Sequence, residues 1–181
     1  MTFQQKLSIV TALAALIGLV MVARAPVAAS ALHRAKPRAG ASVATYLAVI
    51  AVALMLVGVV SRTLIRHAVQ IAPLVLALAL SLRRSVWGVV AAVPLFAFWL
   101  LVMGGIWLFL LGIARVFPGT FSPTEIVLTL IIGAASMAGL AVAYGQRAST
   151  AIATQVGTVI VFAILQFGAM WLSVQPFVAR R

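Results

Sequence analysis

The stretch VWGVVAAVPLFAFWLLVMGGIWLFLLGIA, residues Val86 to Ala114, contains no charged side chain. As one straight α-helix it would be roughly 43 Å long at 1.5 Å per residue, which exceeds the roughly 30 Å of hydrocarbon in a bilayer. Pro94 lies inside the run and is expected to kink such a helix, because it has no amide to donate to the preceding turn. A run of this kind is typical of a helix that crosses a membrane.

The composition of the whole chain agrees with this interpretation. Hydrophobic residues make up 65% of the 181 residues and charged residues 8%, whereas about 25% of a soluble domain is charged. The sequence therefore predicts an all-α, polytopic integral membrane helical bundle in one domain, residues 1–181. Six spans are expected, at about residues 7–23, 43–60, 64–82, 86–114, 125–144 and 151–174.

Two alternatives concern the number of spans. The long run could form a re-entrant segment within residues 86–114, which would leave five full spans, although an exposed hairpin tip would place unpaired backbone groups in lipid. The first run could be a secretory signal with a cleavage site near the "ASA" of Ala29 to Ala31. Its length favours a retained span, so six spans is the main prediction.

Basic residues gather outside the apolar runs, and the densest basic segment is the linker at residues 24–42. The formal net charge is +12, but the cations lie in short loops between spans. Such loops favour anionic lipid head groups and the cytoplasmic side rather than nucleic acid, which is not expected as a partner. The Arg-, Ala- and Val-rich composition favours a bacterial inner (cytoplasmic) membrane. The cations divide almost evenly between the two faces, so the orientation stays open.

Polar side chains share one face where the third span begins. At 100° per residue, Arg62, Thr63, Arg66, His67 and Gln70 lie within 140° of each other. Arginine forks bind phosphate in a bidentate way, so this face is a candidate site for an anion or a lipid head group. The alternative is that these side chains extend to the membrane–water boundary.

The sixth span carries a second polar stripe, formed by Gln155, Thr158, Gln166 and Ser173. Glutamine amides inside a span are costly unless they find partners. The stripe therefore predicts either hydrogen bonds to a neighbouring helix or the lining of a polar path.

The only carboxylate of the chain, Glu125, follows a pattern typical of a helix start. Ser122 can cap the helix, Pro123 suits the first helical position, and Glu125 at the third position can accept from the Ser122 amide. The pattern predicts a helix cap rather than a proton relay.

The chain offers little for catalysis or for metal binding. It has no Cys and two His, and Glu125 is its single acidic residue. No carboxylate pair, nucleophile constellation or metal motif is present, so we expect no enzyme activity, no metal and no cofactor.

Two functions are compatible with these features. The first is a non-catalytic membrane subunit or scaffold that packs against a protein partner in the membrane, with anionic lipids around it. The alternative is a small permease or a lipid- or anion-handling protein, whose polar cavity would lie between the third and sixth spans.

Overall fold

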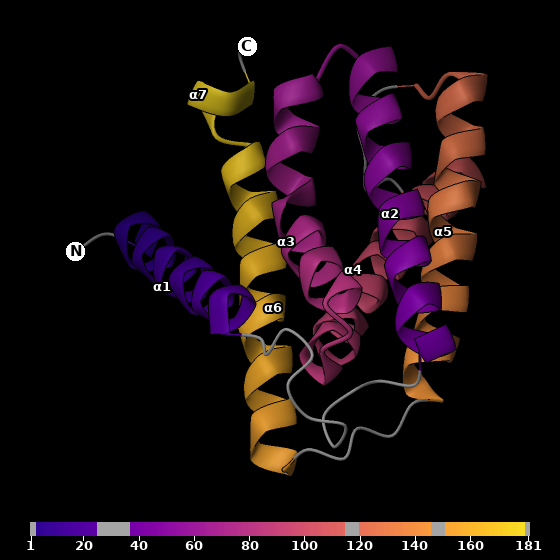
Figure 1. Cartoon of the computed structure of the whole chain (residues 1–181). Coiled ribbons are helices and arrows are strands. Elements are labelled where there is room, and N and C mark those ends of the chain that lie inside the picture. The colour runs from indigo at the N-terminus through magenta and orange to yellow at the C-terminus, as the bar shows by residue number, and fades with distance from the viewer. Residues whose placement is uncertain (1–2, 25–36, 115–119, 146–150, 180–181) are drawn as a thin grey trace.

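The computed structural model describes residues 3–24, 37–114, 120–145 and 151–179, and these residues form helices and turns without a β-strand (Figure 1). Six of the helices are long and apolar enough to cross a membrane. The all-α bundle of six spans is therefore confirmed. In chain order the helices are α1 (Phe3–Arg24), α2 (Pro37–Val60), α3 (Leu64–Leu82), α4 (Val86–Leu110), α5 (Pro123–Tyr144), α6 (Ile152–Ser173) and the short α7 (Pro176–Ala179).

Helix α4 is the central element and α1 the most peripheral one. Helix α4 contacts α3, α5 and α6, while α2 packs between α3 and α5. In its most apolar window, 56% of α4 is buried inside the protein, against 17% of α1. Figure 1 shows α1 beside the bundle, crossing α6 at an angle, and α6 is its main contact.

Helix α4 is one continuous helix, and it is shorter than the apolar run that contains it. It passes through Pro94 without a break and ends at Leu110 rather than near Ala114. Gly112 adopts a φ of +73°, its amide donates to Phe109 O, and the Ile113 amide donates to Leu108 O. These two bonds are a Schellman motif, which ends a helix even where apolar sequence continues. The described part of the run is thus a single span and not a re-entrant segment.

The turns after α2 and α3 use the same motif with an arginine in place of glycine. Thr63 and Ser85 donate their amides to Gly58 O and Leu80 O, five residues back. Arg62 and Arg84 occupy the left-handed position, with φ values of +56° and +55°. A residue with a Cβ is less stable there than glycine, although a cation near a helix C-terminus is favourable.

The basic linker lies mostly outside the described residues. Residues 25–36, which include the "ASA" of the possible cleavage site, are among those not described. The helix of the second span begins at Pro37, so the last part of the predicted linker belongs to α2.

Helices α4 and α5 approach each other closely because α5 presents glycine to aromatic rings of α4. A Cβ on Gly133 would overlap the ring of Trp107, and a Cβ on Gly139 would lie 2.5 Å from Phe96. The Trp107 indole N–H also donates to the Thr129 hydroxyl at 3.2 Å. This contact is mainly a steric fit of large rings against a backbone without side chains, as is common between membrane helices.

Candidate functional site

The main polar contact inside the bundle joins α3 to α6. The Gln70 amide nitrogen donates to the Ser173 hydroxyl at 2.9 Å and lies 3.4 Å from the Met170 sulfur. Both Gln70 and Ser173 are buried. The Ser173 hydroxyl donates onward to Met170 O at 2.7 Å, within its own helix. A glutamine one turn and a half into α3 is thereby paired with the end of α6.

A second hydrogen bond joins the same two helices. The Gln166 amide nitrogen donates to the backbone oxygen of Gln70 at 3.3 Å. Pro73 lies three residues further along α3, and it removes the amide that would bond to the neighbouring Val69 carbonyl. The carbonyl without its helix donor is therefore that of Val69, next to the Gln70 carbonyl that accepts from Gln166.

One atom of this contact has no hydrogen-bond partner among the described residues. Gln166 is fully buried, and its Oε1 is an unpaired acceptor. Exchanging the nitrogen and oxygen of the Gln166 side-chain amide would place its oxygen against the Gln70 carbonyl oxygen. Both atoms are acceptors, so the hydrogen bond between α6 and α3 would be lost. We call Gln70, Gln166, Met170 and Ser173 the α3–α6 polar cluster.

The other two members of the polar stripe lie away from this cluster. The Thr158 hydroxyl is buried and donates to Thr154 O at 2.8 Å, within α6 itself. Gln155 is half-buried near the beginning of α6. The stripe therefore has two parts: Gln166 and Ser173 form hydrogen bonds with α3, whereas Thr158 forms its hydrogen bond within α6.

The polar face at the start of α3 also divides. Nδ1 of His67 lies 3.1 Å from both the hydroxyl and the backbone oxygen of Thr63, and Thr63 lies 2.6 Å from the Ser61 hydroxyl. These contacts hold the α2–α3 turn. Arg62 is exposed and Arg66 is half-buried. Gln70 is the member of the face that reaches α6.

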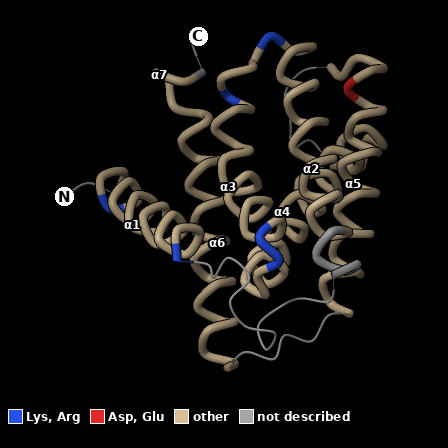
Figure 2. Tube along the Cα trace, viewed as in Figure 1, with Lys and Arg blue, Asp and Glu red and all other residues tan. Residues whose placement is uncertain are grey.

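A capping box begins α5. The Ser122 amide and hydroxyl both donate to Oε2 of Glu125, at 2.7 and 2.8 Å, and the Glu125 amide donates to the Ser122 hydroxyl at 3.3 Å. Pro123 is the first residue of the helix. In Figure 2 the acidic position, red on the trace, lies at the end of the bundle that also carries the α2–α3 turn, opposite the basic α3–α4 turn. The acid is engaged at a helix end and does not enter the α3–α6 polar cluster.

Met170 is the cluster member that the sequence did not single out. Residues 166, 170 and 173 recur at intervals of four and three, so they share one helix face. The position of Met170 between two polar residues on that face was the feature of the sequence that could have indicated its contact. The role of Gly133 and Trp107 had no comparable signal, because small residues and aromatics are frequent in every span of this chain.

The arrangement can hold two helices together and can accept one further hydrogen bond. Its members are amides, a hydroxyl and a thioether, which do not exchange protons near neutral pH. Within the described ranges, no three His, Cys, Asp or Glu side chains lie close enough to hold a metal ion. No protein-family model, curated protein or solved structure matches this chain.

Proposed function

We propose that this multi-pass membrane protein is a non-catalytic subunit or scaffold that packs within a larger complex, in a bacterial inner membrane. The observation that carries the proposal is the pairing of the α3 and α6 glutamines and of Thr158 within the bundle; among the described residues, the buried hydroxyls of Ser81 and Ser136 and the Trp99 indole N–H have no such partner. Gln70 is bonded to Ser173, Gln166 to Gln70 O, and Thr158 to its own helix. Side chains engaged in this way stabilise a bundle and leave few groups to handle a substrate.

The outer surface of α5 offers a face for a protein partner. Val127, Leu130, Ile131 and Met137 are exposed large apolar residues on α5. They lie within 120° of each other around the helix, at 100° per residue. A stripe of this kind packs equally well against lipid tails or against another apolar helix, and the scaffold proposal assigns it to a helix of the partner.

Co-purification tests the proposal. The protein is extracted in a mild detergent, and proteins that accompany it are identified by mass spectrometry. A photo-crosslinking residue at Leu130 is expected to capture the same protein, while one at the buried Ile132 on the same helix is the control. Recovery of a lone monomer, with crosslinks only to lipid, would contradict the proposal.

A second candidate is a small permease or anion-handling protein that uses the region between α3 and α6. It is favoured by the unpaired Gln166 Oε1 and by the half-buried Arg66, one turn before Gln70. Efflux of chloride and of inorganic phosphate from proteoliposomes separates the two candidates. Flux that is lost in a folded Gln166→Leu variant would favour the permease, while absence of flux in the unaltered protein favours the scaffold.

A further inference from the structure

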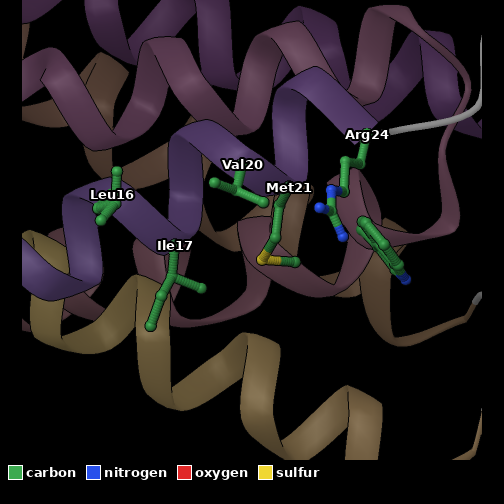
Figure 3. A pocket seen from close by; sticks show the side chains of 6 residues that line it. Leu16, Ile17, Val20, Met21 and Arg24 are labelled. Carbon is green, nitrogen blue, oxygen red and sulfur yellow. The ribbon is translucent and has the colours of Figure 1, made fainter.

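A groove on the outside of the bundle lies between the second half of α1 and the beginning of α4 (Figure 3). Its volume is about 250 Å³, below the roughly 300–1,000 Å³ typical of pockets for small molecules. The groove is lined by Leu16, Ile17, Val20, Met21, Arg24 and Trp87. It is separate from the α3–α6 polar cluster and from the arginines at the start of α3.

The walls of the groove are apolar along most of its length. Leu16, Ile17 and Val20 are exposed in the fold of this chain, so they need a cover of hydrocarbon in a membrane. In Figure 3 these side chains follow one another along α1 toward Arg24 at its C-terminal end. The distance from Leu16 to Arg24 along the helix is about 12 Å at 1.5 Å per residue. The apolar lining thus extends over about 12 Å of α1, which suits a segment of one acyl chain.

The end of the groove at Arg24 is cationic. Arg24 ends α1, and the guanidinium of Arg83, which follows α3, donates to the Val22 carbonyl in the last turn of α1. That bond supplies a donor to one of the carbonyls that a helix end leaves unpaired, and it ties α1 to the α3–α4 turn. Two arginines thus lie where two spans end, which is where lipid head groups are expected.

No acidic side chain of this sequence is available to balance these cations. The only acidic residue, Glu125, is bonded to Ser122 at the start of α5. Among the described residues, therefore, no side chain neutralises Arg24 and Arg83, and an anion from another molecule can do so. Trp87, in the first turn of α4, supplies an aromatic ring at the same level, as interfacial tryptophans do.

We propose that the α1 groove is a binding site for an anionic phospholipid. One acyl chain lies along Leu16, Ile17 and Val20, and the phosphate accepts hydrogen bonds from Arg24, with the charge of Arg83 beside it. The occupant has an apolar tail and an anionic head, and these match the apolar length of the groove and its cationic end at Arg24. The proposal does not depend on the scaffold function.

Arg84 adds a further cation at this end of the bundle. It occupies the left-handed position of a Schellman motif, where glycine would be more stable. Arg62 has the same conformation in the α2–α3 turn, so the conformation belongs to both turns, and only the charge of Arg84 bears on the groove. Its side chain is exposed and adds a third positive charge next to Arg83.

Native mass spectrometry of the intact protein tests the site. The protein is exchanged into detergent with equal amounts of phosphatidylglycerol and phosphatidylcholine, and the ratio of the two retained lipids is measured. Because a cation near an anionic surface contributes a factor of about five, the unaltered protein should prefer phosphatidylglycerol at least fivefold. Arg24→Gln should lower this ratio about fivefold. Lys6→Gln removes the same charge from the other end of α1 and should leave the ratio unchanged.

Two further variants separate lipid binding from folding. Arg84→Gly should unfold at the same temperature or a higher one and yet lower the preference for phosphatidylglycerol. Val20→Trp should occupy the groove and reduce retention of both lipids, whereas Leu19→Trp places the same ring on α1 outside the groove lining. Equal retention of the two lipids by the unaltered protein, or equal effects of Arg24→Gln and Lys6→Gln, would overturn the proposal. So would a photo-crosslinker at Ile17 that captures a protein in place of lipid.

Discussion

The contact of α4 with α5 and the contact of α3 with α6 join neighbouring helices by different means. Between α4 and α5, aromatic rings lie against Gly133 and Gly139, where there is no room for a Cβ. Between α3 and α6, Gln70, Gln166 and Ser173 form hydrogen bonds across the interface. Lipid tails are as apolar as the side chains of a span, so moving apolar surface from lipid into a helix contact gains little free energy. Helices in a membrane therefore associate through close packing or polar pairs. In this chain the α4–α5 contact is mainly close packing, with one hydrogen bond from Trp107 to Thr129, whereas the α3–α6 contact has hydrogen bonds from two buried glutamines.

The two contacts are expected to tolerate substitutions differently. A close-packed contact has no space into which a new atom can go, so adding a methyl group is costly. A polar contact has partners that can exchange, because the Ser173 hydroxyl also bonds to Met170 O. The α4–α5 contact should therefore be sensitive to added volume, while the α3–α6 contact should respond to the loss of a donor by a smaller amount.

The largest effect is expected from Gly133→Ala. The new methyl group would overlap the Trp107 ring, so α5 must move away or the ring must change its orientation, at a cost of about 2 kcal/mol. The free energy of unfolding in mixed micelles of mild detergent and sodium dodecyl sulfate measures it. Gly104→Ala in α4 is the control, because no neighbouring atom lies within 4 Å of its added Cβ. Equal stability of the two variants would contradict the close-packed contact.

A smaller effect is expected from Gln70→Leu. The change removes the donor to Ser173 but leaves the Ser173 hydroxyl bonded within α6 and the Gln70 backbone oxygen in place. Hydrogen bonds between membrane helices contribute about 0.6 kcal/mol on average and up to about 1.7, so a loss of about 1 kcal/mol is predicted in the same unfolding measurement. A loss as large as that of Gly133→Ala would show that the two contacts do not differ as described.

Gln166→Leu should be nearly neutral, although this side chain is the more deeply buried of the two glutamines. The substitution removes a hydrogen bond of 3.3 Å, and it also removes an acceptor that has no partner among the described residues. If the unpaired acceptor costs about 1 kcal/mol, the low end of the usual range of about 1–3, and the hydrogen bond contributes about 1 kcal/mol, the two effects nearly cancel. A higher cost of the unpaired acceptor would make the variant more stable than the unaltered protein. A loss well above 1 kcal/mol would indicate that Oε1 has a partner in the membrane, such as water or a second protein.

The smallest effect is expected from Glu125→Gln at the start of α5. A glutamine oxygen can accept from Ser122 as the carboxylate does, so the unfolding free energy should change by less than about 0.5 kcal/mol. Ser122→Ala removes the hydroxyl that accepts from the Glu125 amide and should cost about 1 kcal/mol. A folded but inactive Glu125→Gln protein, once an activity can be assayed, would overturn the assignment of this acid to a cap.

The sequence predicts the class of the fold because membrane spans are recognisable by length and hydrophobicity alone. It also predicts the bonded groups of the capping box, because that pattern is local. Hydrophobicity alone predicts that the fourth span continues to Ala114, but the helix ends at Leu110, because Gly112 takes a left-handed backbone conformation there. The pairing of Gln70 with Ser173 joins residues 103 positions apart, and helix periodicity gives the face of a helix but not the neighbour it meets.

The most direct test of the account is a double-mutant cycle between Gln70 and Ser173. The stabilities of Gln70→Leu, Ser173→Ala and the double variant are compared with that of the unaltered protein in one unfolding assay. If the polar side chains of the spans hold α3 to α6, the coupling energy should be about 0.5–1.5 kcal/mol. A coupling energy of zero within error, with both single variants folded, would contradict the structural role assigned to the α3–α6 polar cluster.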